Sequence, residues 1–270
     1  MCIRDRYIYK SSGIYVFSNS IVAGLEGIYY DQDGDSDQNG STKNGGKISN
    51  NTITGEIRSK GIYSRTNYTS GDTIINNSIR RTEEYESCCP TTHFIRSRDH
   101  WGRDTLGVIK GNTVLYDDSI GTTHQWGHQY GIYSSGDYID SNYVEMDHRH
   151  QPGYEVYSIN AYRSHVTRNT LKNNSKDNGH TQYFIYANHG SNDSLLIQGN
   201  TLTLEHWGGH TWEYGIYTDG CQSCVYDISN NTIKSNSYAI SKLVNLQGKT
   251  YFYNNAVTAT NDQRANMISI

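Results

Sequence analysis

Four segments of the chain carry His, Trp and Tyr at similar places: residues 123–130, 147–154, 176–183 and 205–214. Together they hold seven of the eleven His residues. Trp and Tyr rings can stack on sugar rings, and His beside a carboxylate can move protons or bind hydroxyl groups. The segments therefore predict a substrate-binding surface that contains Trp126, His128, His150, His180, Trp207, His210 and Trp212. The alternative is a row of amphipathic residues that covers a structural edge, because His and Trp are commonly half-buried.

A second set of candidate residues follows an aliphatic residue in successive segments of the chain. Its members are Tyr29, Tyr63, Arg96, Tyr133, Tyr157, Tyr186 and Tyr217, and Arg96 leads into Asp99, His100 and Trp101. Arg can neutralise a sugar carboxylate, while Tyr or His can act as base and acid. This pattern predicts a catalytic group of Arg96, Asp99, His100 and Tyr133, with Tyr63 and Trp101 binding substrate. The structural alternative is a stack of Tyr residues on neighbouring strands.

An acidic insertion at residues 31–46 could bind a metal ion. The run Asp35-x-Asp37-x-Asn39-Gly40 matches the first half of a calcium loop, in which alternate carboxylates converge and Gly permits the sharp turn. It departs from the EF-hand at the twelfth position, where Gly46 replaces the expected Glu. We expect Ca²⁺ to be bound by Asp31, Asp33, Asp35, Asp37 and Asn39, with a solvated acidic loop as the alternative.

A repeated phrase shows which elements position these residues. Asn followed two residues later by an aliphatic residue occurs at Asn19, Asn51, Asn77, Asn112, Asn142, Asn169, Asn200, Asn231 and Asn255, at spacings of 24 to 35 residues. Such a period indicates a stack of similar units. Each unit holds short runs of alternating polarity between Gly, Asn, Asp and Ser, which predicts strands joined by turns, and no sustained helical stripe occurs.

We therefore predict a right-handed parallel β-helix of about nine coils, an all-β solenoid in which stacking buries each strand against the next coil. The pattern resembles the pectate lyase-like superfamily of parallel β-helix repeat proteins over nearly the whole chain. We expect one inward row of Ile28, Ile62, Ile95, Ile132, Val156, Ile185 and Ile216, and a corner row of the repeated Asn residues. The resemblance is specific for fold and not for function, because polysaccharide lyases, glycoside hydrolases, epimerases, tailspikes and adhesins share this fold.

Composition and the chain ends set further expectations. Residues 1–6 resemble an adaptor-derived leader at the end of a metagenome-assembled reading frame, and residues 7–270 are predicted to be one β-helix domain, truncated at both ends. The net charge of −4 and the scattered Lys and Arg argue against a nucleic-acid partner, and no segment approaches the ~20 apolar residues of a membrane span. Cys221 and Cys224 predict a local disulfide in an oxidising compartment, or else free thiols.

These observations favour a secreted or cell-surface protein that recognises, and in an extended hypothesis also cleaves, polysaccharide along a lateral face. The alternative is a non-catalytic structural or adhesive solenoid. The polygalacturonase motifs Asn-Thr-Asp, Gly-His-Gly and Arg-Ile-Lys and the epimerase motif Asp-Pro-His are absent. Whether the protein is an enzyme, its substrate and its oligomeric state therefore stay open at this level.

Overall fold

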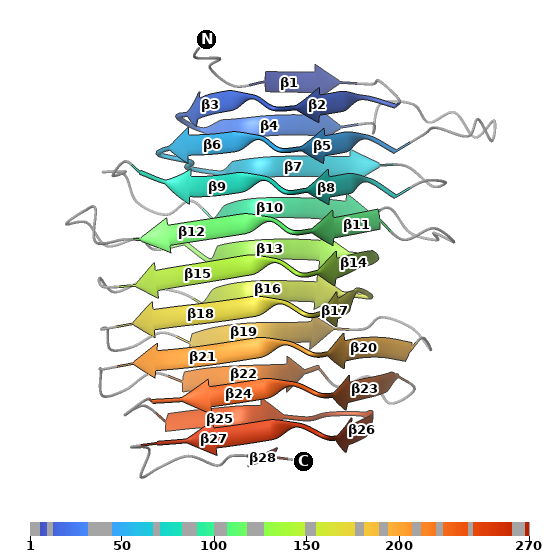
Figure 1. Cartoon of the computed structure of the whole chain (residues 1–270), viewed down its shortest axis with the longest axis vertical. Coiled ribbons are helices and arrows are strands. Elements are labelled where there is room, and N and C mark those ends of the chain that lie inside the picture. Colours follow the sequence, from blue (N-terminus) through green and yellow to red (C-terminus); the bar gives the residue numbers. More distant parts are fainter. Residues whose placement is uncertain are drawn as a thin grey trace.

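The computed structural model describes residues 6–9, 13–31, 45–66, 71–82, 91–99, 107–117, 127–148, 155–175, 181–188, 194–206, 212–219, 224–236, 240–260 and 268–269. These residues form only strands and turns, and none of them belongs to a helix that could span a membrane. The chain winds through three parallel sheets, which we call A, B and C, and returns to each sheet once per coil (Figure 1). The all-β parallel β-helix is thereby confirmed.

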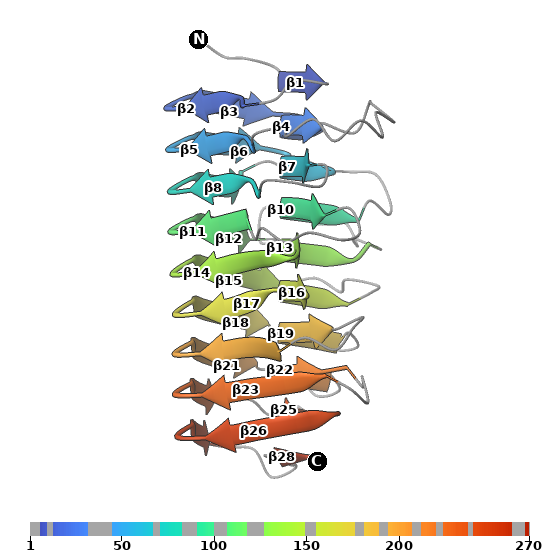
Figure 2. The same cartoon turned by 90° about the vertical axis from the view of Figure 1, so that its right-hand side faces the viewer.

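Sheet A lies behind the other two in Figure 1 and beside them in Figure 2. It contains ten strands: β1 (Arg6–Tyr9), β4 (Glu26–Asp31), β7 (Lys60–Thr66), β10 (Thr92–Asp99), β13 (Gln129–Ser135), β16 (Val156–Tyr162), β19 (Thr181–Asn188), β22 (Trp212–Thr218), β25 (Ile240–Asn245) and β28 (Ile268–Ser269).

Sheets B and C have nine strands each and meet at a corner. Sheet B contains β2 (Tyr15–Phe17), β5 (Lys47–Ser49), β8 (Thr73–Ile75), β11 (Gly107–Lys110), β14 (Asp137–Asp140), β17 (His165–Thr167), β20 (Ser194–Gln198), β23 (Val225–Ser229) and β26 (Lys249–Tyr253). Sheet C contains β3 (Ser20–Ala23), β6 (Thr52–Gly55), β9 (Ser78–Arg81), β12 (Thr113–Asp117), β15 (Tyr143–His148), β18 (Thr170–Ser175), β21 (Thr201–His206), β24 (Thr232–Ser235) and β27 (Ala256–Ala259).

The predicted inward row runs down sheet A and is confirmed for six of its seven members. Ile28, Ile62, Ile95, Ile132, Ile185 and Ile216 occupy one register position and have no exposed surface. The assignment of Val156 to this row was wrong, because Ile159 is the residue that pairs with both Ile132 and Ile185. Strand β16 contains two aliphatic residues three positions apart, and the phrase Val-Tyr selected the earlier one. Val156 is also buried, but it lies in a different row.

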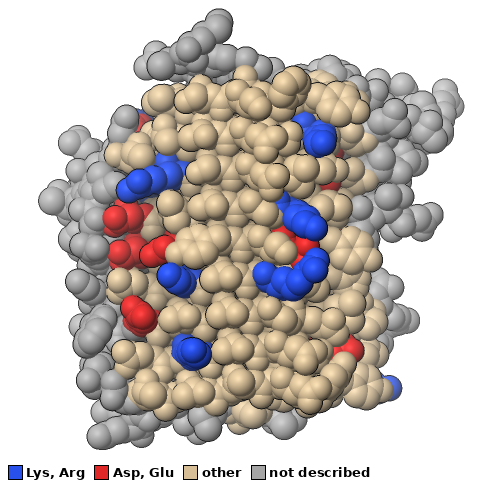
Figure 3. Space-filling model, in the orientation of Figure 1, with Lys and Arg blue, Asp and Glu red and all other residues tan. Residues whose placement is uncertain are grey.

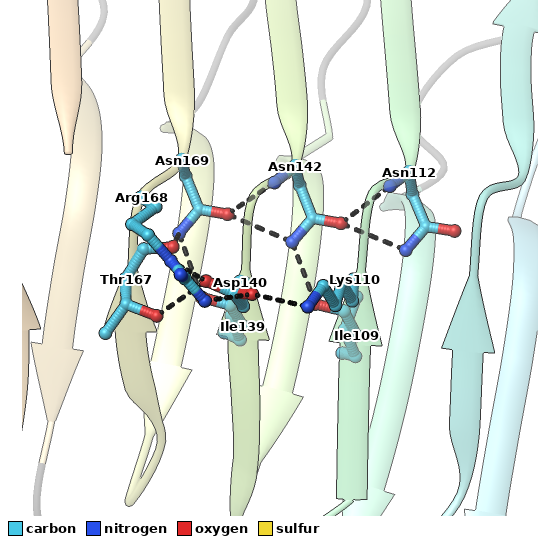
Figure 4. Close-up of polar contacts among 9 residues, drawn as sticks. All are labelled: Ile109, Lys110, Asn112, Ile139, Asp140, Asn142, Thr167, Arg168 and Asn169. Atoms are coloured by element: carbon cyan, nitrogen blue, oxygen red, sulfur yellow. Dashed lines mark hydrogen bonds and ion pairs between the residues drawn. The ribbon is translucent and has the colours of Figure 1, made fainter. Parts of the chain in front are cut away.

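The corner between sheets B and C is held by a ladder of the repeated Asn side chains, as predicted (Figure 4). The backbone N–H and the Nδ2 group of Asn112 donate to Oδ1 of Asn142 at 2.9 and 3.0 Å, and Asn142 repeats both bonds to Asn169. Nδ2 of Asn142 also donates to the carbonyl oxygen of Ile109 at 2.9 Å. The ladder therefore satisfies buried turn backbone that no strand can reach.

The residue before each ladder Asn adopts a left-handed conformation, with φ between 54° and 66°. Gly occupies this place at Gly111 and Gly199, but Arg168 adopts it at a cost of roughly 1–2 kcal/mol. Its guanidinium donates to both oxygens of Asp140 at 2.7 Å, and Lys110 Nζ lies 3.3 Å from the same carboxylate (Figure 4). Burial opposes ionisation of Asp140, but the hydrogen bonds from Arg168 and Thr167 outweigh it and lower the pKa of Asp140.

Candidate functional site

The outer face of sheet A carries two rows of aromatic and cationic side chains, which we call the aromatic face. The first row is Lys60, His93, Tyr130, Tyr157, Tyr183 and Tyr214, and the second is Tyr29, Tyr63, Arg96, Tyr133, Asn160, Tyr186 and Tyr217. On the opposite face, formed by sheets B and C, charged side chains of both signs gather toward the two sides, with uncharged residues between them (Figure 3).

A local break in strand alternation places both rows outside. In β10, Phe94 and Ile95 are adjacent and both fully buried, so His93 and Arg96 on either side of them point outward. The same arrangement recurs in β13, where Gly131 precedes Ile132. A Cβ atom at Gly131 would lie 2.6 Å from the carbonyl oxygen of Ser158, which explains the Gly at this place in the Gly-Ile-Tyr phrase.

Rings of the first row stack on one another along the solenoid. The centroid distances are 4.6 Å for His93–Tyr130, 4.8 Å for Tyr130–Tyr157, and 4.9 Å for both Tyr157–Tyr183 and Tyr183–Tyr214. All four pairs are within 9° of parallel. The faces of Tyr130, Tyr157 and Tyr183 are therefore covered by their neighbours, and the row presents ring edges and hydroxyl groups to a ligand.

Rings of the second row meet the first row edge-on. Tyr133 lies 5.5 Å from Tyr130 at 90°, and Tyr186 lies 5.3 Å from Tyr183 at 82°. This T-shaped geometry suits the electrostatics of aromatic rings and locks the two rows together. Tyr157, of the first row, is only 7% exposed. The face is consequently rigid where it is aromatic.

Cationic groups lie at the end of the face formed by β4, β7 and β10. The guanidinium carbon of Arg96 is 5.7 Å from the ring centroid of Tyr63 and 5.3 Å from that of Tyr133. Lys60 Nζ lies 4.5 Å from the Tyr63 centroid and 3.1 Å from Oε1 of Glu26. These charges rest on electron-rich ring faces, which is a favourable cation–π arrangement.

His93 lies within this cationic group but is itself neutral. Burial lowers its pKa to about 3, and the nearby charges of Arg96, Lys60 and His128 act in the same direction. Its ring therefore stacks on Tyr130 as a neutral imidazole at physiological pH.

Carboxylates accept hydrogen bonds from Tyr hydroxyl groups at two edges of the face. Tyr157 donates to Oε2 of Glu155 at 2.6 Å, and His128 Nδ1 lies 3.5 Å from the same oxygen. Tyr186 donates to Oδ2 of Asp219 at 2.9 Å. Burial, followed by the bond to Glu155, raises the pKa of Tyr157, and burial raises that of Tyr130 to about 12. These phenols are hydrogen-bond donors at neutral pH and not bases.

The structure brings together three of the residues expected to bind or transform substrate. Tyr63, Arg96 and Tyr133 share one register position on the adjacent strands β7, β10 and β13. Asp99 is the last residue of β10, where it pairs with Thr66. Trp212 opens β22, is 44% exposed, and lies 5.9 Å from Lys242 Nζ. His100, Trp101, Trp126, His150, His180, Trp207 and His210 lie outside the described residues.

The four His-rich segments connect neighbouring strands of the same two sheets. They join β12 to β13, β15 to β16, β18 to β19 and β21 to β22, each passing from sheet C to sheet A. Their ends therefore stand side by side along one edge of the aromatic face. His128, at the end of the first segment, lies 6.4 Å from the Tyr157 ring. A shared surface formed by all four segments stays a prediction.

Of the expected calcium ligands, only Asp31 belongs to the described residues. It ends β4, is buried, accepts a hydrogen bond from Tyr29 at 3.3 Å and lies 3.9 Å from Arg65 Nη1. Asp33, Asp35, Asp37 and Asn39 fall outside the described residues. In the described part of the chain, no three His, Cys, Asp or Glu side chains gather as a metal site.

Sequence reasoning placed Tyr157 in the second row, where Asn160 lies, and missed the rest of the first row of the aromatic face and the carboxylates that border it. A signal was present, because an aromatic or His residue precedes the second-row residue by three positions in five coils, as His93/Arg96, Tyr130/Tyr133, Tyr157/Asn160, Tyr183/Tyr186 and Tyr214/Tyr217. Comparisons with protein-family models, curated proteins and solved structures found no match to this chain. The geometry of the face is therefore the basis for a functional proposal.

Proposed function

We propose that the protein recognises polysaccharide along the aromatic face of sheet A. The observation that carries the proposal is the run of stacked rings from His93 to Tyr214 in the first row, with Tyr residues of the second row packed edge-on against it and Arg96 and Lys60 beside its β7 and β10 end. Ring edges and hydroxyl groups repeat at the strand spacing, so an extended chain with repeating hydroxyl groups can meet equivalent contacts in successive coils. The exposed Trp212 offers an indole face on which a sugar ring can stack.

The cationic end extends the proposal to acidic polysaccharide. Arg96 contacts two Tyr rings and forms no ion pair within the described residues. A carboxylate on a sugar would supply the planar partner that a guanidinium prefers. Cleavage is the further step of the proposal, with Arg96, Asp99, His100 and Tyr133 as the catalytic group. Because the phenols of Tyr130 and Tyr157 are protonated, we propose a carboxylate or a His as the base of this catalytic group.

Two further parts of the proposal concern the setting of the protein. Cys224 is fully buried and disulfide-bonded, which supports a secreted or cell-surface location because disulfides persist in oxidising compartments. The acidic segment at residues 31–46 is proposed to bind Ca²⁺, with weak affinity as in extracellular modules.

A structural or adhesive solenoid is the second candidate, and one specific observation favours it. Ring faces of the first row cover one another, and Tyr157 and Tyr186 already donate to Glu155 and Asp219. Such contacts stabilise a stack without any ligand. The two candidates differ in whether removal of an exposed ring on this face weakens glycan binding.

A glycan array followed by calorimetry on the bound glycan tests the proposal. Trp212→Ala should weaken binding by about 1–3 kcal/mol, by analogy with stacking of bases on aromatic side chains. Tyr138→Ala is the matched control, because Tyr138 is equally exposed at 44% but lies on sheet B. Arg96→Ala should weaken only anionic glycans. Binding to no glycan, or equal losses for Trp212→Ala and the control, would refute the proposal and leave the structural solenoid.

A further inference from the structure

The second row of the aromatic face contains one small residue between two Tyr rings in the middle of sheet A. Strand β16 places Asn160 at the register position that Tyr133 holds on β13 and Tyr186 holds on β19. All three side chains are partly exposed. Tyr133 and Tyr186 are two strand spacings apart, roughly 10 Å, and the residue between them carries no ring. We call the space above Asn160 the ring slot.

The following coils show what a ring at this register position contacts. Tyr186 stacks on Tyr217 of the next coil at a centroid distance of 5.3 Å and an angle of 6°. It also meets two first-row rings edge-on, Tyr183 of its own coil at 5.3 Å and Tyr157 of the preceding coil at 5.6 Å. A second-row ring therefore packs face to face within its row and edge-on against two rings of the first row.

The corresponding contacts are missing around the ring slot. Among the described residues, Tyr157 meets no second-row ring of its own coil, because Asn160 holds that place. Tyr130 likewise lacks the edge-on contact from the next coil that His93 receives from Tyr133 at 5.5 Å. A six-membered ring above Asn160 would supply both edge-on contacts and would also stack between the two rings that border the slot.

The two rings that border the slot are held from their far sides. The guanidinium carbon of Arg96 lies 5.3 Å from the ring centroid of Tyr133, and Tyr217 stacks on Tyr186 from the next coil. Tyr186 also donates a hydrogen bond to Oδ2 of Asp219 at 2.9 Å. These contacts oppose rotation of either ring into the slot.

The slot has a polar floor and short connections on the side that faces sheet B. Gly136 alone joins β13 to β14, and only Arg163 and Ser164 join β16 to β17. Arg163 rests on the ring of Tyr162, with its guanidinium carbon 5.4 Å from the centroid. Within the part of the chain that the structure describes, the amide of Asn160 forms no hydrogen bond. This amide can donate to or accept from a polar group of a ligand.

The thickness of the slot decides which class of ring fits. Neighbouring first-row rings are parallel within 9° at centroid distances of 4.8 and 4.9 Å, so they form an offset stack whose ring planes lie closer than the centroids. Two such spacings hold one flat ring in van der Waals contact, at about 3.5–4.0 Å, with a Tyr ring on each side. A chair-shaped sugar ring is thicker, because hydrogens or hydroxyl groups project from both of its faces.

We propose that the ring slot binds a planar six-membered aromatic ring that carries a polar group, as in a phenol. The ring stacks between Tyr133 and Tyr186, its polar group reaches the amide of Asn160, and a substituent at the opposite (para) position points to solvent. The rest of the ligand is attached through this outward substituent, so a phenolic group on a sugar and a tyrosyl group on a peptide present the same chemistry. The site does not depend on binding of a polysaccharide backbone.

NMR titrations observed on the ligand test the site with two small molecules of matched size. p-Cresol is flat, whereas 4-methylcyclohexanol carries the same substituents on a chair-shaped ring, and we expect only p-cresol to bind. Asn160→Tyr fills the slot and should abolish this binding. Tyr186→Ala removes one ring face and should weaken it roughly fivefold or more, as for loss of one stacked aromatic side chain. N-acetyltyrosinamide and 4-hydroxyphenyl β-glucoside then distinguish a peptide from a sugar as the carrier of the ring.

Urea unfolding followed by circular dichroism provides a second test without any ligand. Asn160→Tyr should raise the urea midpoint, because the added ring completes the second row. Thr201→Tyr is the matched control, since it adds a ring at an exposed position of sheet C between Thr170 and Thr232, and it should leave the midpoint lower than Asn160→Tyr does. Four results would overturn the proposal: no binding of p-cresol, equal binding of the two probes, p-cresol binding that persists in Asn160→Tyr, or a lower urea midpoint for Asn160→Tyr than for the control.

Discussion

Replacing Asn142 by Ala should remove one rung of the buried ladder and destabilise the solenoid strongly. The substitution deletes two bonds that Nδ2 donates, to Asn169 Oδ1 and the Ile109 carbonyl, and two that Oδ1 accepts from Asn112. The Asn112 N–H is then buried without an acceptor, whereas its Nδ2 group keeps a 2.8 Å bond to the Ile74 carbonyl. At about 1–3 kcal/mol per buried group left unpaired, the expected loss is about 3–5 kcal/mol.

Asn19→Ala provides the matched comparison at the end of the same ladder. Asn19 Nδ2 donates to Asn51 Oδ1 at 2.8 Å and to the Phe17 carbonyl at 2.9 Å, in a more exposed setting. Its removal should cost only about 1 kcal/mol. Urea unfolding followed by circular dichroism gives the free energy of unfolding of both variants. The slope of this free energy against urea concentration is also compared, because a solenoid can unfold in parts. Equal costs for the two variants would refute the view that burial of the rung sets its contribution.

Three further outcomes are expected. Ile216→Asp places an unpaired charge in the fully buried row of sheet A and should cost several kcal/mol or prevent folding, as urea unfolding will show. His93 has a pKa of about 3 in the folded protein against 6.5 ordinarily, so only the unfolded chain takes up its proton between these values. Stability should therefore fall as pH drops through that window, and less steeply in His93→Phe. Calorimetry should detect Ca²⁺ binding that Asp35→Ala with Asp37→Ala abolishes, and no calcium heat in the unaltered protein would contradict the site.

The fold could be predicted because its signals are local and repeated. Each Asn-x-aliphatic phrase marks a corner where one amide satisfies turn backbone, and each Gly-Ile-Tyr phrase marks a strand with an inward Ile. Register failed in β16, where the aliphatic-Tyr phrase falls on Val156 but Ile159 holds the inward position. The choice between them depends on neighbouring strands, since Tyr157 aligns with Tyr130 and Tyr183 and this stacking fixes the position of Ile159.

Apart from Tyr157, which belongs to the first row, the candidate site was predicted only in its second row. Tyr63, Arg96 and Tyr133 were found because each follows an aliphatic residue, but the first row depends on two adjacent residues turning inward. Alternation along a strand does not predict such a break. Asp219 was missed for another reason, because its partner Tyr186 becomes its neighbour only when the coils are stacked, whereas Glu155 lies just two residues before its partner Tyr157.

Under the proposed function, the aromatic face limits how a polysaccharide can bind. Stacking at 4.6 to 4.9 Å follows the strand spacing, so neither the spacing nor the tilt of the first-row rings can adjust to a ligand without disturbing the sheet. A ligand must therefore match an almost straight array of hydroxyl groups and ring edges. A flexible globular partner gains little from such regularity, whereas an extended polymer with a short chemical repeat can use several coils at once. Selectivity among such polymers then depends on side chains that do not recur in every coil, chiefly Arg96 toward one end of the face and Trp212 toward the other.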